Sequence, residues 1–172
     1  METWQAINTV RVVRQFADRP LANEHLDHIL NAARRTGSSK NEQKWTFIVV
    51  TDREVMRQLT GVGRYSDHLA GAAVAVALVV PDESGLRSRS LLWDLGRAAQ
   101  NMVLAAWELG IGSAPATVFE FDLAARLLGL PDGQKCHYLL SFGYPADPSV
   151  LTQPNKAGGR KPLDAVVRRE RW

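Results

Sequence analysis

The chain has 172 residues and a mass of 19.0 kDa, and its 45% hydrophobic and 23% charged residues are ordinary for one globular domain. This composition excludes a disordered or collagen-like chain, and the single cysteine, Cys136, excludes an intramolecular disulfide and a multi-cysteine metal site. The net charge is +3, but Lys156–Trp172 alone carries +4, from six basic and two acidic residues, so the rest is near −1.

We expect a single domain over residues 1–172 that ends in a basic tail, 155–172. This tail indicates an anionic partner, such as a phosphate group, nucleic acid or an acidic patch on another subunit, unless it is simply solvated. The longest apolar run, Ala70–Pro81, has about 12 residues, fewer than the roughly 20 of a membrane helix. The N-terminus lacks the apolar stretch of a signal peptide, so we expect a cytoplasmic protein without membrane partners.

The first half of the chain predicts short helices, an arginine-bearing segment and one strand. The predicted helices are Glu2–Thr9, Asn23 to about Arg35 with Asn23 as N-cap, and a short helix to about Leu59 capped by Asp52. Val10–Phe16 carries two arginines, and a polar loop, Ser38–Gln43, precedes the β-rich strand Trp45–Thr51.

The second half predicts a buried strand, a long helix and a closing strand. Ala72–Val80 is continuously apolar and β-branched, which favours a central strand covered on both faces. The next helix runs from about Leu86 to Leu109, with Ser84 as a candidate cap and Gly110 as its end. Its apolar stripe is wide enough to predict burial on more than one side, with a second subunit expected to cover Leu91, Leu95, Met102 and Val103.

The remaining elements complete the prediction of fold class. They are a loop or strand at Ser113–Val118, a helix capped by Asp122 that ends at Leu128 before Gly129, and a strand at Cys136–Tyr144. Because helices and strands mix without strict βαβ alternation, the sequence predicts an α+β fold with a central, mostly antiparallel sheet flanked by helices.

Several kinds of catalytic site are absent from the sequence. It contains no GxSxG or GxxxxGK[ST] motif, and neither Gly61–Gly63 nor Gly110–Gly112 has the third glycine of a dinucleotide fingerprint. The four histidines are scattered, so we expect no metal site, and Cys136 in an apolar strand is expected to be an inert thiol.

The polar residues that remain form clusters with phosphate-binding and amide-type groups. They are Arg11 and Arg14, then Ser38, Asn41 and Gln43, and finally Arg160 and Lys161. Guanidinium groups suit phosphate oxygens, and neutral amides and hydroxyls suit the edge of a heterocycle. Taken singly, the arginines could be surface charges and the loop could be only a turn. Together, without a nucleophile or an acid–base pair, they indicate a bound cofactor that carries the chemistry.

The order of five segments resembles the nitroreductase family of flavoenzymes over nearly the whole chain. These segments are AINTVRVVRQF at Ala6–Phe16, RRTGSSKNEQKWTFIVV at Arg34–Val50, DLGRAAQNMVLAAWELGIGSAP at Asp94–Pro115, LSFGYP at Leu140–Pro145 and RKPLDAVV at Arg160–Val167. The resemblance implies an intertwined homodimer with FMN at each subunit interface, reduced by NADH or NADPH, and a tail that reaches the partner subunit.

The resemblance also implies roles for individual residues. Arg11 and Arg14 match basic positions of the opening motif, and Ser38, Asn41 and Gln43 match polar positions that face the ribityl chain and ring. Arg160 and Lys161 match basic tail residues at the phosphate, whereas Pro115, Ala116 and Thr117 match a loop that passes the flavin near N5. No side chain is expected to be catalytic in its own right, since the chemistry belongs to the flavin.

Three positions depart from the family pattern. Val10 and Val12 stand where an arginine and a serine are usual, and Lys44 replaces the proline before Trp45. The phosphate site therefore loses one charge and one hydroxyl, which allows weaker FMN binding, a shifted phosphate or a related cofactor such as a deazaflavin. The short stretch Leu59–Ala72 leaves little room for a helical lid and predicts an open site.

The resulting functional prediction is electron transfer from NAD(P)H through FMN to a small electron-poor acceptor, such as a nitroaromatic or a quinone. Flavin-dependent dehalogenation and flavin breakdown are alternatives within the same fold. A non-catalytic protein that uses its basic tail to bind a partner or nucleic acid is an alternative from another class, with nucleic acid the less expected partner.

Overall fold

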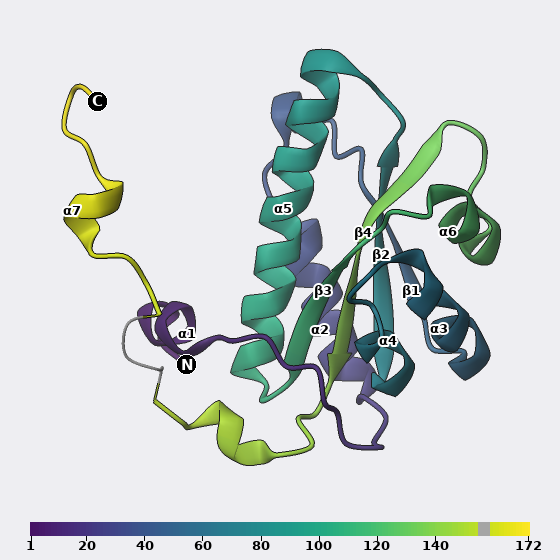
Figure 1. Ribbon diagram of the computed structural model, residues 1–172, viewed down its shortest axis with the longest axis horizontal. Coiled ribbons are helices and arrows are strands. Elements are labelled where there is room, and N and C mark those ends of the chain that lie inside the picture. Colours follow the sequence, from purple (N-terminus) through teal and green to yellow (C-terminus); the bar gives the residue numbers. More distant parts are fainter. Residues whose placement is uncertain (155–158) are drawn as a thin grey trace.

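A computed structural model describes residues 1–154 and 159–172 of the chain. Its sheet contains β1 (Thr46–Val50), β2 (Val74–Pro81), β3 (Gly112–Thr117) and β4 (Gln134–Gly143). The strand order is β1-β2-β4-β3 and each neighbouring pair is antiparallel (Figure 1). This arrangement confirms the α+β prediction, and Ser113–Val118, for which loop and strand were both open, lies mostly in edge strand β3.

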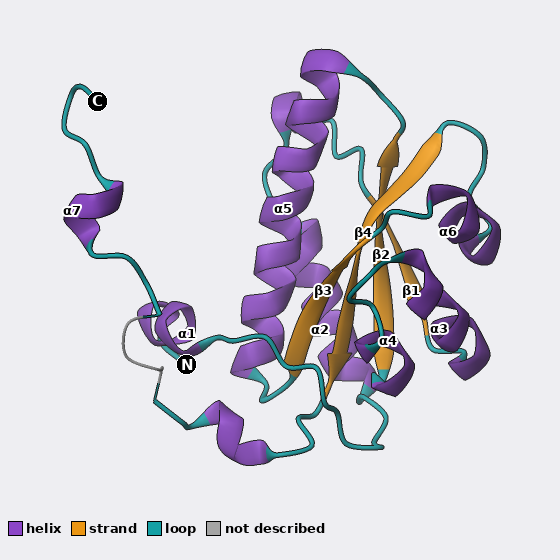
Figure 2. Cartoon of the chain, in the orientation of Figure 1, coloured by secondary structure: helices purple, strands orange, loops and turns teal. Residues whose placement is uncertain are grey.

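Helices cover both faces of this sheet (Figure 2). On one face lie α2 (Asn23–Arg34) and α5 (Gly85–Glu108), and on the other lie α3 (Arg53–Leu59), α4 (His68–Gly71) and α6 (Phe121–Leu128). Each face has its own apolar cluster, and β2 is buried along nearly its full length, as the sequence predicts for a central strand. The short helices α1 (Thr3–Thr9) and α7 (Leu163–Val166) lie near the chain ends.

The helix ends test the predicted caps. Asp52 caps α3, because its carboxylate accepts a hydrogen bond from the Val55 N–H at 2.9 Å. The predictions for Asn23 and Asp122 are wrong, since α2 and α6 are already helical there and their N-caps are Ala22 and Glu120. Ser84 does occupy the N-cap position of α5, but its side chain makes no capping hydrogen bond.

The apolar stripe of α5 is covered by the chain itself, so the prediction that a second subunit covers this stripe is wrong. Leu91, Leu95 and Met102 are 9%, 1% and 0% exposed, and all belong to the cluster that joins α2, α5 and β2. The opposite side of α5 is open and carries Trp93, which is 70% exposed. A contact with another chain would therefore use a different face of this helix.

The extended segment after α1 is held against the sheet by two close glycine contacts. Val12 forms a parallel bridge with Ser113, and Phe16 forms an antiparallel bridge with Pro145. A Cβ at Gly112 would lie 2.6 Å from the Val13 Cβ, and a Cβ at Gly143 would lie 2.8 Å from the Phe16 ring. The absence of side chains at these two glycines therefore sets the position of the segment that carries Arg11 and Arg14.

Gly112→Ala is expected to destabilise the protein by about 1–3 kcal/mol, because the new methyl group overlaps Val13 and the segment must shift. Gly71→Ala is a matched control, since a Cβ there meets nothing within 4 Å, and it should be neutral or stabilise by up to about 1 kcal/mol. Urea unfolding monitored by tryptophan fluorescence measures both. Equal stabilities for the two variants would contradict this account of the contact.

Candidate functional site

Strand β3 has one paired edge and one open edge, and the backbone direction decides which groups face outward. Gly112, Ala114 and Ala116 alternate with Ser113, Pro115 and Thr117 opposite β4. The Val13 N–H donates to the Ser113 carbonyl at 2.9 Å, and the Val118 N–H donates to the His137 carbonyl at 3.0 Å. Antiparallel alternation therefore directs the Pro115 carbonyl and the Thr117 N–H away from β4.

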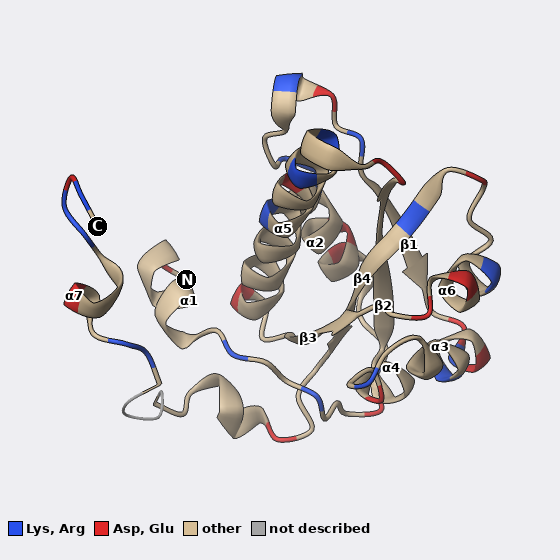
Figure 3. Ribbon diagram, turned by 45° about the horizontal axis from the view of Figure 1, so that its top comes forward, with Lys and Arg blue, Asp and Glu red and all other residues tan. Residues whose placement is uncertain are grey.

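Arginine side chains gather around the extended segment that forms a bridge with Ser113 near the start of this edge. A hollow of about 370 Å³ is lined by Arg14 and Arg64, together with Gln15, Tyr65, Asp67 and His68. A second hollow of about 290 Å³ lies along residues 11–15 and is lined by Arg11 and Arg14. Figure 3 shows the basic positions along the extended segment that follows α1. Arg64 was not predicted from the sequence. The only feature that could have pointed to it is its basic charge in the glycine-bounded stretch after Leu59.

The polar loop with Ser38, Asn41 and Gln43 is shaped by backbone conformation and by α5. Lys40, Asn41 and Gln43 have φ values of 51°, 57° and 50°, in the left-handed region that non-glycine residues rarely adopt. The Ser38 hydroxyl accepts a hydrogen bond from the Gln43 N–H at 3.0 Å. The Asp94 carboxylate, on a residue only 6% exposed, accepts one from the Ser39 N–H at 2.8 Å. Sequence reasoning missed Asp94 as the residue that anchors this loop.

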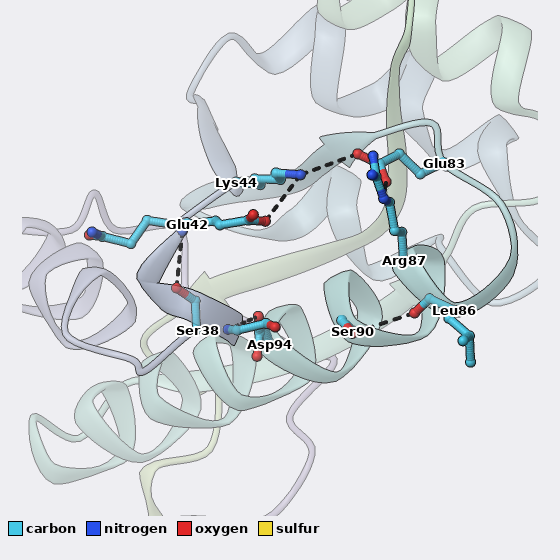
Figure 4. Close-up of polar contacts among 10 residues, drawn as sticks. Ser38, Glu42, Lys44, Glu83, Leu86, Arg87, Ser90 and Asp94 are labelled. Carbon is cyan, nitrogen blue, oxygen red and sulfur yellow. Dashed lines mark hydrogen bonds and ion pairs between the residues drawn. The ribbon is translucent and has the colours of Figure 1, made fainter.

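Lys44 joins the end of this loop to the start of α5 (Figure 4). Its ammonium group lies 3.1 Å from the Glu42 carboxylate and 3.4 Å from the Glu83 carboxylate. Hydrogen bonding to Lys44 lowers the pKa of Glu42, and the same two carboxylates raise the pKa of Lys44. The lysine that replaces the expected proline thus closes one side of a hollow of about 270 Å³ between the loop and α5.

The two clusters attach to α5 at separate places within one chain, one near the middle of the helix and one near its C-terminal end. The loop is attached at Asp94, whereas the segment with Arg11 begins beside Trp107, whose indole N–H donates to the Thr9 hydroxyl at 2.9 Å. At 1.5 Å per helical residue, these attachment points are about 20 Å apart along the axis. The structure therefore groups Arg11 and Arg14 with β3, and Ser38, Asn41 and Gln43 elsewhere.

The basic tail is separate from both clusters. Figure 1 shows α7 and the C-terminus away from the sheet and α5. The Arg160 guanidinium donates to the neighbouring Gly159 carbonyl at 3.2 Å, and Arg160 and Lys161 are both exposed. The chain does not bring them to the hollows beside Arg11 and Arg14, and Lys156 lies outside the described residues.

The remaining candidates for a functional site are the thiol of Cys136 and clusters of metal-binding side chains. Cys136 is buried, and burial raises the pKa of its thiol to about 12, as expected for an unreactive cysteine. Within residues 1–154 and 159–172, no cluster of three histidine, cysteine or acidic residues could hold a metal ion. The described helices include none that is both long and apolar enough to cross a membrane.

Comparison with known proteins identifies the family. The model of the nitroreductase family matches residues 8–74 and 62–144, which include the arginine segment, the polar loop, β3 and all of β4. A relative from Archaeoglobus fulgidus, described as a "Putative NADH dehydrogenase/NAD(P)H nitroreductase", is 34% identical over 152 residues, or 85% of this chain and 87% of its own length. The chain belongs to the nitroreductase family.

More distant relatives have related names. The "Iodotyrosine deiodinase" of Thermotoga neapolitana is 27% identical, over 80% of this chain and 86% of its own. The "FMN reductase [NAD(P)H]" of Bacillus subtilis is 26% identical, over 99% and 74%. The solved structure of an FMN-dependent nitroreductase from Clostridium difficile shares the fold, with a TM-score of 0.84 over 99% of this chain and 100% of that one, at 23% identity.

Asp94→Ala is expected to cost about 1–3 kcal/mol of folding stability, because it leaves the Ser39 N–H without its buried acceptor. Asp94→Asn should recover much of this loss, since the amide oxygen can still accept that hydrogen bond. The control is Glu108→Ala, on the same helix but with an exposed carboxylate paired with the N-terminus; its effect should stay below about 1 kcal/mol. Chemical denaturation compares the three, and a harmless Asp94→Ala would refute the anchoring role.

Proposed function

We propose that this protein is an FMN-dependent oxidoreductase that takes electrons from NADH or NADPH and passes them to a small electron-poor acceptor. The observation that carries the proposal is the open edge of β3, where an outward Thr117 N–H lies on the strand flanked by Arg11 and Arg14. When bound there, FMN supplies the hydride and electron chemistry, and the protein supplies binding, orientation and charge.

The residues of this edge fit the chemistry of a flavin mononucleotide. Arginine forks suit its phosphate oxygens, and positive charge beside the ring stabilises its anionic reduced form. A backbone N–H such as that of Thr117 suits the flavin N5 position, and the backbone around Pro115 and Ala116 supports it. Arg64 adds a cation close to Arg14, which offsets the charge that the opening motif lacks at Val10.

A homodimer completes the site in this proposal. An antiparallel pair of α5 helices, aligned so that Asp94 of one helix lies opposite Trp107 of its mate, would bring the polar loop of one subunit to the arginine segment of the other. Ser38, Asn41 and Gln43 would then face the ribityl chain and ring from the partner subunit, and the basic tail with Arg160 and Lys161 would extend to the partner.

The exposed face of α5 contains a feature that suits such a crossing. Gly96 is at the middle of the 24-residue helix, it is exposed, and a Cβ there would meet nothing within 4 Å. A glycine inside a helix costs roughly 0.5–1 kcal/mol relative to alanine, with no compensating contact in the single chain. Close approach of a second helix at this point accounts for the glycine.

The acceptor is a small planar molecule such as a nitroaromatic or a quinone. The stretch between α3 and β2 is filled by a short 3-10 turn, Thr60–Val62, and by α4, so no long helix from this stretch covers the edge. The hollow beside Arg14 is consequently open, which supports a permissive substrate site over a closed one. Solvent can deliver protons in an open site of this kind.

The purified wild-type protein is expected to bind FMN and to show the absorbance of oxidised flavin, which NADH or NADPH should bleach. Arg11→Ala and Arg14→Ala should each weaken FMN binding roughly 10- to 150-fold, the equivalent of about 1.5–3 kcal/mol for a charge-assisted hydrogen bond. Asn41→Ala and Gln43→Ala should each weaken FMN binding by about 1–3 kcal/mol, because each leaves a polar group of the bound flavin without its hydrogen-bond partner.

Fluorescence titration of the apo-protein at two salt concentrations measures these affinities. Arg126→Ala on α6, away from both clusters, is the control and should bind like wild type. A colourless protein that retains nucleic acid, with an affinity that falls steeply with salt, would support the non-catalytic alternative instead.

Gly96→Leu is expected to convert the dimer to a monomer, because a branched side chain at this exposed position would push the partner helix away from α5. The matched substitution Gly71→Leu, at the exposed last residue of α4, should leave the dimer intact. Light scattering at micromolar concentration distinguishes the two masses. A wild-type mass of one chain, or an unchanged dimer in Gly96→Leu, would rule out this crossing.

A further inference from the structure

His68 is a buried polar side chain that the proposed function does not use. It begins α4 and is 6% exposed, and its Nδ1 lies 2.8 Å from the hydroxyl of Ser141 in β4, which is fully buried. Its Nε2 is buried and has no hydrogen-bond partner within the described residues. Ser141 is itself unusual, because its neighbours Leu139, Leu140 and Phe142 are apolar core residues.

Both polar groups are directed at β3. Ser141 lies opposite Ala114 in the register, and its hydroxyl is 3.3 Å from the Ala114 carbonyl. The next carbonyl along the strand, that of Pro115, faces the open edge two residues before the outward Thr117 N–H, and it raises the pKa of His68 against the larger effect of burial. The His68–Ser141 pair is therefore linked by hydrogen bonds to the Ala114 carbonyl, in the strand segment that leads to Thr117.

Apolar packing alone does not account for this pair. A leucine of similar size could fill the space of His68 without a buried nitrogen that lacks a partner. Other charged and titratable groups around the ring are Arg14, Arg64, Tyr65 and Asp67, which line the same hollow. Burial first, and then the charge of Arg14, lower the pKa of His68, so the ring is neutral near pH 7. A neutral ring can link β4 to the β3 edge without adding charge.

We propose that His68, together with Ser141, is a positioning residue for the open edge of β3, and that it fixes the direction of the Thr117 N–H. The inference rests on the proposed function, in which this N–H contacts the flavin near N5. His68 acts through the backbone of Ala114 and Pro115. It therefore adjusts the hydrogen bond that tunes the flavin, while the phosphate is held by other residues.

The test compares two substitutions at His68 in the full-length protein loaded with FMN. His68→Leu preserves bulk and removes the ring nitrogens, including the hydrogen bond with Ser141. His68→Asn retains an amide near the position of Nδ1, within reach of Ser141. The measurements are the FMN dissociation constant, the reduction potential of the bound flavin and the unfolding temperature of the apo-protein.

His68→Leu is expected to shift the flavin reduction potential and to weaken FMN binding about tenfold, with the apo unfolding temperature unchanged or raised. His68→Asn should restore most of the potential and affinity, and Ser141→Ala should shift the potential in the same direction as His68→Leu. His25→Leu is the control, because it removes another imidazole–hydroxyl pair, 3.0 Å from Tyr144, and should leave the potential at its wild-type value.

A His68→Leu protein with wild-type potential and affinity would overturn the inference while leaving the proposed function intact. Equal losses in the Leu and Asn variants, in step with a lower unfolding temperature, would also overturn it, since they indicate a purely structural role. A wild-type protein that binds no FMN would overturn the proposed function and this inference together.

Discussion

The burial of α5 by its own chain is the constraint on which the rest of the molecule depends. Leu95, Ala98 and Met102 are inaccessible or nearly so beneath α2 and the sheet, so the helix cannot rotate or slide without opening the core. The two points on α5 where the polar loop and the arginine segment attach are therefore fixed, about 20 Å apart along its axis. A core that stabilises one chain thus also fixes where the polar loop and the arginine segment lie.

The polar loop and the arginine segment are held in place by different kinds of contact. At the Asp94 end, a buried carboxylate and the Ser38 hydroxyl hold a loop with three left-handed non-glycine residues. Such backbone geometry costs free energy and persists only where surrounding contacts maintain it. At the other end, the arginine segment lies flat because Gly112 and Gly143 leave room for Val13 and Phe16. One cluster is shaped by hydrogen bonds and the other by close packing.

The fold class was predictable because its signals are local. The continuous apolar run of β2, the helical spacing of α5 and the glycines at 110 and 129 each determine a segment without reference to distant residues. The cap positions at Asn23 and Asp122 were not predictable, since Asn and Asp also occur in the first helical turn. The apolar stripe of α5 was correctly predicted to be buried, but sequence periodicity does not distinguish burial against the same chain from burial against another.

The candidate site was less predictable, because its contacts join residues far apart in the sequence. Asp94 meets Ser39 across 55 positions and His68 meets Ser141 across 73. Neither contact has a spacing that a motif could record. Residue types indicated the polar clusters, and the resemblance to the nitroreductases implied their roles. Neither predicted the residues that support the clusters, nor Arg64.

An edge strand is an unexpected place for a site, because its unpaired backbone groups invite association with other chains. In β3, three features of the strand and its neighbours leave few backbone groups free for such association. Pro115 has no N–H, the Ser113 carbonyl accepts from Val13, and Gly63 packs so closely on the Thr117 carbonyl that a Cβ there would lie within van der Waals overlap. This arrangement leaves the Thr117 N–H facing outward, on the strand whose Ser113 lies beside the arginine segment and whose Ala114 carbonyl contacts Ser141. The same features that discourage pairing with another strand therefore leave a single backbone donor in a positively charged setting, which is the property a flavin-binding edge requires.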